Sequence, residues 1–183
     1  MAGLSLYDAY VPTLITILDS LESILTRAAT YAEENNLDVN AEYIKARLYE
    51  DMQPLTFQIQ VVSNITKSFV MRVGGVEVES WEDNETTFEQ LFARINKTRE
   101  LIKSVKPEDI NGKESQFVEL KAGPDVYKTT GLAYVSTFTI PNAFFHLQTT
   151  YAILRMKGVP LAKKNFLGPF LSKDLNSPYF IEK

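Results

Sequence analysis

Apolar side chains recur at spacings of three and four residues along most of this chain. Residues 4–35 carry the repeat Val11, Leu14, Ile15, Leu18, Leu21, Leu25 and Ala28. Residues 55–73 repeat it with Leu55, Ile59, Val62, Ile65, Phe69 and Val73, and residues 88–105 with Phe88, Leu91, Phe92, Ile95, Ile102 and Val105. Such spacing lines one face of an α-helix. With a fourth helix over residues 134–157, the pattern predicts four long helices around one core.

Local signals set the expected ends and interruptions of these helices. Ser5-Leu-Tyr-Asp8 has the spacing of a capping box, and Pro12 lacks an N–H, so we expect a break or kink near residues 10–12. Pro141 predicts a kink or restart in the fourth helix, and Gly158 ends it. A short helix is expected over residues 40–48. The acidic residues 77–85 are interpreted as a solvated loop, with Trp81 anchoring it on the bundle.

A different pattern occupies the stretch between the third and fourth helices. Residues 117–121 and 126–130 alternate apolar and polar side chains around Gly123-Pro124. Alternation of this kind predicts a β-hairpin, which is marginal alone and should pack on a helix pair or a second subunit. The tail, residues 159–183, is rich in apolar side chains, including Phe166, Phe170, Tyr179 and Phe180, and is expected to lie against the bundle. We predict an all-α, up-down four-helix bundle with a small hairpin, forming a single domain over residues 1–183.

Composition narrows the partners and the compartment. The net charge of −4 disfavours nucleic acid, because phosphate binding needs a basic surface. No run of about 18 apolar residues predicts a membrane span, and the first residues lack the basic start of a signal peptide. The chain contains no cysteine, which excludes thiolate chemistry and fits a reducing compartment. We therefore expect a cytoplasmic protein with no nucleic-acid or membrane partner.

One histidine carries the clearest candidate chemistry. His146 is the only histidine, and helical spacing puts Asn142, Thr149 and Thr150 on its side of the fourth helix. These residues form a polar strip in an otherwise apolar helix. The strip is interpreted either as the wall of a ligand cavity, with His146 as acid, base or hydrogen-bond donor, or as a core histidine satisfied by a neighbour.

The second helix carries further polar side chains among apolar ones. Gln60 and Asn64 lie four residues apart and could contact a ligand from one face. A solvated helix edge or an interhelical hydrogen bond is the alternative, and it is favoured for Gln58.

Four groups of residues resemble one family over nearly the whole chain. They are Ser5-Leu-Tyr-Asp8 with Val11-Pro12; Ala46-Arg-Leu48 with Asp51-Met52 and Pro54-Leu55; Phe57-Gln-Ile-Gln60 followed by Lys67; and a C-terminal block of Pro141-Asn142, Phe145-His146, Thr150-Tyr-Ala-Ile-Leu-Arg155, Gly158-Val-Pro-Leu161 and Phe166-Leu-Gly168. Together they resemble an uncharacterised branch, found in bacteria and fungi, of the DinB/YfiT-like four-helix bundles. The resemblance implies an up-down bundle, often dimeric, with a cavity between its helices.

The resemblance also implies a metal site in the better-known relatives. Those relatives take one histidine from helix two and an H-x-x-x-H pair from a later helix. Here the pair is Asn142-x-x-x-His146, and the helix-two position is Asn64-Ile65. A neutral amide is a poor ligand for a transition metal, so we predict a degenerate site with no metal and no cofactor.

Three functions are compatible with the sequence. The first is a small-molecule-binding bundle, or a cofactor-free isomerase, cyclase or lyase, that takes a hydrophobic metabolite in the bundle cavity. Its candidate catalytic residue is His146, with Asn142, Thr149, Gln60 and Asn64 as ligand contacts. The second is a residual metalloenzyme, and the third is a non-catalytic dimerising bundle. We adopt the first, and expect a homodimer because the hairpin and aromatic tail present apolar surface.

Overall fold

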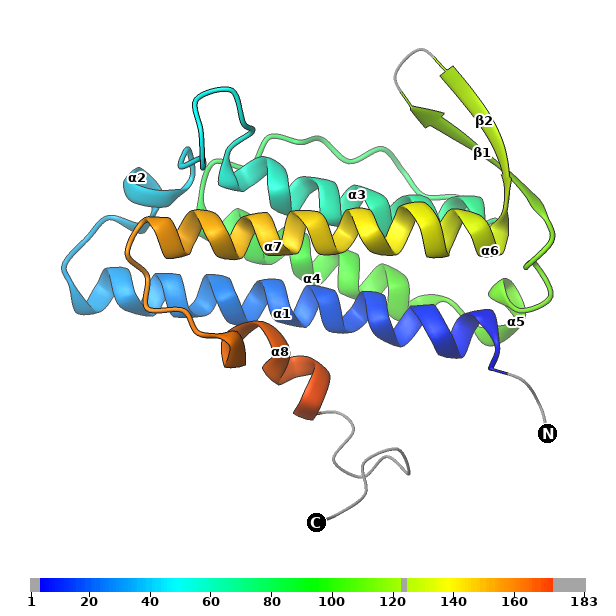
Figure 1. The fold of residues 1–183 in the computed structure, drawn as a ribbon, viewed down its shortest axis with the longest axis horizontal. Helices are drawn as coiled ribbons and strands as arrows, with labels where there is room; N and C mark the ends of the chain where they lie inside the picture. Colours follow the sequence, from blue (N-terminus) through cyan, green and yellow to red (C-terminus); the bar gives the residue numbers. More distant parts are fainter. Residues whose placement is uncertain (1–3, 123–124, 173–183) are drawn as a thin grey trace.

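A computed structural model describes residues 4–122 and 125–172 of the chain. Its long helices are α1 (Leu6–Glu34), α3 (Leu55–Arg72), α4 (Phe88–Ser104) and α7 (Ile140–Met156). The shorter elements are α2 (Val39–Tyr43), α5 (Pro107–Ile110), β1 (Phe117–Ala122), β2 (Asp125–Thr130), α6 (Gly131–Ala133), the π-helix η1 (Tyr134–Thr139) and α8 (Lys163–Ser172). Figure 1 shows the four long helices side by side with the hairpin at one end. The predicted four-helix bundle with a hairpin before its last long helix is confirmed.

Each long helix packs on two others around the bundle. Helix α3 contacts α7 and α4, and α1 also contacts α4 and α7, so α1 and α3 lie on a diagonal. The helices bury the apolar stripes that the sequence predicts, with Leu18, Phe69 and Leu91 among the side chains without exposed surface. The helical spacing of these residues therefore builds one continuous core.

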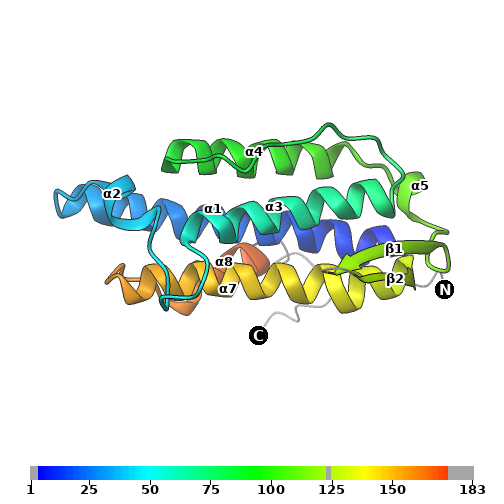
Figure 2. The same cartoon turned by 90° about the horizontal axis from the view of Figure 1, so that it is seen from above.

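Helices α3 and α4 run in the same direction. The connection between them, residues 73–87, passes back along the bundle from the end of α3 to the start of α4 (Figures 1 and 2). We call this segment the crossover. Up-down alternation therefore holds from α1 to α3 and from α4 to α7, but not from α3 to α4. The long connection lets two consecutive helices pack as parallel neighbours.

Helix α1 is continuous, so of the break or kink expected near residues 10–12 the break does not occur. Ser5 caps the helix as predicted, because its Oγ accepts a 3.1 Å hydrogen bond from the backbone N–H of Asp8. Pro12 lies inside the helix but on its exposed side. Water can satisfy the carbonyl that Pro12 leaves unpaired, while the buried neighbours Val11 and Leu14 hold this turn in the core.

The hairpin forms at the predicted residues. Strands β1 and β2 pair antiparallel from Phe117 opposite Thr130 to Ala122 opposite Asp125. Val118 is buried and Leu120 is partly buried against the core, whereas Phe117 points to solvent with 76% of its surface exposed. Alternation along β1 thus gives the hairpin one face on the bundle and one face outside.

The last long helix is preceded by a π-helical turn. Pro141 lacks an N–H, and its ring would clash with the carbonyl four residues earlier in an α-helix. The wider turn of η1 ends at Thr139, two residues before Pro141, and the backbone N–H of Ile140 is bonded to the carbonyl of Val135. The predicted interruption at Pro141 is therefore a local widening, and the helix continues through it.

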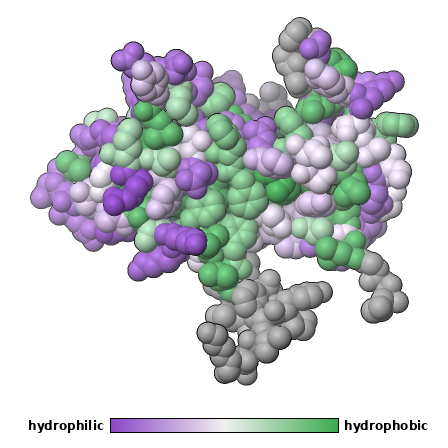
Figure 3. Space-filling model, viewed as in Figure 1, coloured by the Kyte–Doolittle hydropathy of each residue, from purple (hydrophilic) through white to green (hydrophobic). Residues whose placement is uncertain are grey.

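The tail folds back onto the bundle as far as it is described. Helix α8 packs on α1, where Ser20 Oγ donates a 2.9 Å hydrogen bond to the carbonyl of Phe166. The ring of Phe170 stacks on Phe144 of α7. Figure 3 shows an apolar band down the middle of this face toward α8. The prediction for the tail is confirmed up to residue 172, while Tyr179 and Phe180 lie outside the described residues.

Candidate functional site: a groove between α3 and α7

His146 is hydrogen bonded to Gln58 across the α3–α7 interface. Its Nδ1 lies 2.7 Å from Gln58 Oε1. The Gln58 amide is held by its Nε2, which donates to the carbonyls of Gln53 at 2.9 Å and Pro54 at 3.3 Å. Because Nε2 is committed as a donor, Oε1 can only accept. His146 must therefore carry its proton on Nδ1, which leaves the Nε2 atom of the imidazole with a lone pair.

The surroundings of His146 keep the ring neutral. The ring is partly buried and lies edge-on to Phe57 and Phe145, with ring centroids 6.0 and 5.1 Å away. Burial lowers the pKa of His146, because an apolar environment disfavours the imidazolium. Nε2 makes no hydrogen bond within the described residues. It is not fully buried, so it is open to solvent. The site holds a neutral imidazole whose lone pair faces outward.

Asn142 and Asn64 line a separate pocket on the same interface. The pocket has a volume of about 230 Å³.

 The pocket beside Asn142 is lined by Val61, Asn64, Ile65, Ser68, Arg72, Leu120, Tyr134, Phe138 and Asn142. We call it the α3–α7 groove.

Helical spacing explains why these side chains meet. The α3 residues of the groove lie at spacings of three and four, and so share one face of that helix. From the other side come Tyr134, Phe138 and Asn142, each four residues after the last. A step of four residues is slightly less than one full turn in η1 and slightly more than one full turn in α7. The two deviations have opposite signs, so the π-helical turn keeps these three side chains in line. π-helical turns occur frequently at functional sites.

The polar groups of the groove differ in what they already bind. Asn64 donates to both carboxylate oxygens of Asp83, at 3.2 and 3.0 Å. Within the described chain, by contrast, the side chains of Asn142 and Ser68 make no hydrogen bond. Both are partly buried. The groove therefore combines apolar walls with two polar side chains that are free to bind a ligand.

The structure does not bring the five predicted site residues together. Asn64 and Asn142 share the groove, but His146 is not among its lining residues, so the expected common wall for Asn142 and His146 is not seen there. Gln60 is buried and donates a 2.8 Å hydrogen bond to Glu85. Thr149 donates to the carbonyl of Phe145 in its own helix, at 2.7 Å. Gln58 makes an interhelical hydrogen bond to His146, which is one of the two alternatives to ligand contact that the sequence leaves open for it.

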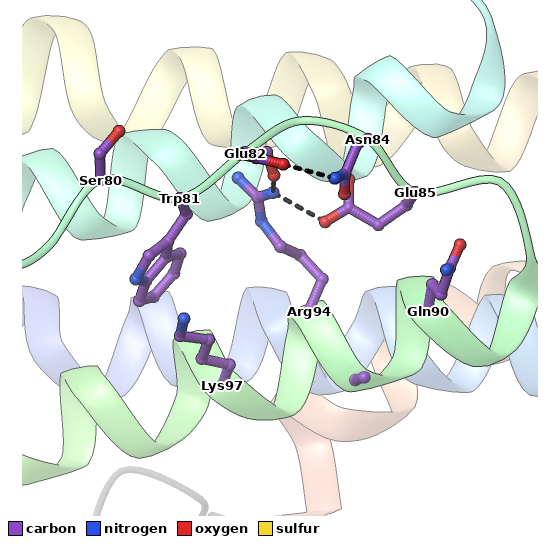
Figure 4. A pocket seen from close by; sticks show the side chains of 9 residues that line it. Ser80, Trp81, Glu82, Asn84, Glu85, Gln90, Arg94 and Lys97 are labelled. Atoms are coloured by element: carbon purple, nitrogen blue, oxygen red, sulfur yellow. Dashed lines mark hydrogen bonds and ion pairs between the residues drawn. The ribbon is translucent and has the colours of Figure 1, made fainter.

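Arg94 organises a polar cluster that the sequence did not indicate. Its five N–H groups meet five acceptors at 2.7–2.9 Å: Ser63 Oγ, Asn64 Oδ1, the carbonyl of Glu82, Asp83 Oδ1 and Glu85 Oε1. Figure 4 shows Arg94 reaching from α4 to the crossover. Residues 77–85 are therefore more than a solvated loop, because two of their acids hold a buried guanidinium.

The residues at the metal positions of the family do not fit a metal ion. The amide oxygen of Asn64 accepts from the Arg94 guanidinium, which places a positive charge where a cation would bind. His146 offers only Nε2, which is a single ligand where a metal site needs three or four. In residues 4–122 and 125–172, no three His, Cys, Asp or Glu side chains are grouped so that they could hold a metal ion. Nor is any helix of this part long and apolar enough to cross a membrane.

Comparisons with known proteins agree with this architecture. The family described as "Domain of unknown function (DUF1993)" matches residues 6–167, and the chain belongs to this family. A crystal structure of a DinB family member protein from Shewanella denitrificans is similar, with a TM-score of 0.79 and 28% sequence identity over 89% of this chain and 92% of that one. No curated protein matches the chain. The resemblance inferred from the sequence is confirmed.

Proposed function

We propose that this member of the DUF1993 family binds a small molecule with an apolar body in the α3–α7 groove. The observation that carries the proposal is Asn142, a partly buried amide among apolar side chains that has no hydrogen-bond partner in the described chain. Its polar atoms are not fully buried, so water can hydrogen bond to them in the free protein. A ligand that hydrogen bonds to Asn142 and covers the apolar walls would replace this water and bury the groove.

The experiment compares ligand binding by the native protein and two variants. Metabolites with apolar bodies are screened by thermal shift, because a ligand that binds the native state raises the melting temperature. Asn142→Leu should weaken the binding of a hit about tenfold or more, which corresponds to about 1.4 kcal/mol. Gln148→Leu is the matched control, since this exposed amide of the same helix lies outside the groove.

Two results would overturn the groove as the binding site. One is a screen in which no compound stabilises the native protein. The other is a hit whose affinity is the same in Asn142→Leu and in the native protein. Circular dichroism of each variant shows whether the bundle is intact before affinities are compared.

A second candidate function rests on His146. Its proton is fixed on Nδ1 and its Nε2 lone pair is open to solvent, which is the state of a general base. Under this candidate the protein is a cofactor-free enzyme, and His146→Ala abolishes turnover while leaving the affinity of groove ligands unchanged. Turnover that survives in His146→Ala removes this candidate and leaves the groove proposal in place.

A further inference from the structure

One end of the α3–α7 groove holds an arginine that has no counter-ion in the part of the chain that the structure describes. Arg72, in the last turn of α3, is partly buried, and its Nη1 donates a 3.2 Å hydrogen bond to the hydroxyl of Tyr134. Its guanidinium lies 5.6 Å from the centre of the Tyr134 ring. These contacts hold the side chain against the groove but leave most of its N–H donors without an acceptor.

The other arginines show that this is unusual for the molecule. Arg27, Arg94 and Arg99 are also buried or partly buried, and each forms an ion pair with at least one carboxylate. Arg47 and Arg155 are exposed and need no partner. Within the described residues, Arg72 is thus the one arginine withdrawn from solvent that has no carboxylate in ion-pair distance.

The polar groups of the groove are spread along its length. Arg72 and Tyr134 lie at one end, Ser68 follows one turn away, and Asn64 and Asn142 lie at the other end. Eight residues separate Arg72 from Asn64 on α3, which corresponds to about 12 Å along the helix axis. Val61, Ile65, Leu120 and Phe138 supply the apolar walls.

We infer that the ligand is a small monocarboxylate whose acid group binds Arg72 and whose apolar body extends toward Asn142. This inference rests on the proposed binding function of the groove. It adds the chemical class of the ligand, including a second hydrogen-bonding group, such as a hydroxyl, at the end that reaches Asn142.

Carboxylate chemistry fits the donors at this end. A guanidinium presents paired N–H groups that match the two oxygens of a carboxylate. Tyr134 is fully buried, and its hydroxyl accepts from Arg72, so it holds the guanidinium in place at this end of the groove. Ser68 offers a further hydroxyl. Arg72 is the one cationic residue that lines the groove, so a single negative charge balances it better than a dianion such as phosphate.

The test uses three related probes and isothermal titration calorimetry at pH 7. The probes are 3-(4-hydroxyphenyl)propanoate, its neutral primary amide, and 3-phenylpropanoate. We expect the acid to bind at least tenfold more tightly than the amide, and 3-phenylpropanoate to bind more weakly than its hydroxylated analogue. Arg72→Met should reduce the affinity for the acid to that for the amide. Arg155→Met is the matched control, an exposed arginine of α7 outside the groove.

The outcomes separate this inference from the proposed function. The inference that the ligand is a carboxylate is overturned if the acid and the amide bind with equal affinity. It is also overturned if a folded Arg72→Met variant binds the acid as tightly as the native protein does. If neutral compounds still bind and Asn142→Leu weakens them, the groove proposal stands. Absence of binding by both acids and neutral compounds overturns both. Should Arg72→Met fail to fold, Ser68→Ala and the acid–amide comparison in the native protein decide the question.

Discussion

The side-chain oxygen of Gln58 accepts a hydrogen bond from His146. The amide nitrogen of Gln58 donates to the backbone carbonyls of residues 53 and 54, so the oxygen can act only as an acceptor. This contact joins the first turns of α3 to the middle of α7. It fixes the tautomer of the only histidine in the chain. Because no other histidine titrates, the ionisation of this one side chain can be followed directly in the stability of the protein.

We predict that acidification through the histidine range destabilises the protein through His146. Burial lowers its pKa in the folded state, while in the unfolded chain the pKa is about 6.5. Below that pH the unfolded state takes up a proton that the folded state resists, so the free energy of unfolding falls, by at most about 1.4 kcal/mol per pH unit for one group. Urea unfolding from pH 5 to pH 8 should show this slope in the native protein but not in His146→Gln.

The partner of His146 provides a control with the opposite sign. In Gln58→Glu a carboxylate replaces the amide oxygen beside Nδ1 and favours the imidazolium, so the pKa of His146 should rise. The loss of stability on acidification should then shrink or reverse. Identical slopes in the native protein, His146→Gln and Gln58→Glu would contradict this account of the site.

We predict that Arg94→Met is strongly destabilising. The guanidinium side chain is 3% exposed, and its removal leaves the nearly buried Glu85 without its ion pair. Breaking a buried pair on one side costs about 3–5 kcal/mol, and the partial exposure of Asp83 places the expected loss near the lower value. Urea unfolding measures it, and amides of the crossover should exchange faster with solvent.

The control for Arg94 is its neighbour on the same helix. Lys97 pairs with Glu79 at the surface, where both side chains are more than half exposed. Lys97→Met should leave the free energy of unfolding nearly unchanged, because exposed ion pairs contribute little. A loss in Arg94→Met no larger than that in Lys97→Met would show that Arg94 does not hold the crossover.

We predict a homodimer that uses the outer face of the hairpin. Phe117 and Val126 lie on the same face of β1 and β2, and 76% and 55% of their surfaces are exposed. A two-stranded hairpin with exposed apolar residues gains stability when a second chain covers it. Light scattering at low micromolar concentration should give twice the chain mass of 20.8 kDa.

Substitution of one hairpin residue tests where the two chains meet. Phe117→Asp should produce the single-chain mass, whereas Tyr49→Asp, a change at another exposed aromatic residue outside the hairpin, should not. A native protein that has only the single-chain mass refutes the dimer. A dimer that persists in Phe117→Asp moves the contact elsewhere on the surface.

The sequence by itself determined the elements of the fold. Periodic burial defined α1, α3 and α4 within a few residues, alternation defined the hairpin, and Ser5 marked the start of α1. These signals are local, because the spacing of apolar residues decides which face of an element is buried. Pro12 gave a misleading local signal, because whether a helix can contain a proline depends on which side of the helix faces solvent.

Tertiary structure alone decided how the elements and the site residues meet. A spacing of four residues puts Asn142 and His146 on one side of α7. In the structure, however, His146 contacts Gln58 of α3, whereas Asn142 lines the open α3–α7 groove. The partners of Arg94 and the missing partner of Arg72 come from segments distant in sequence. A helical pattern specifies which side of a helix is buried, but it does not specify which residues of other helices pack against that side. The chemistry of this protein depends on those packing partners.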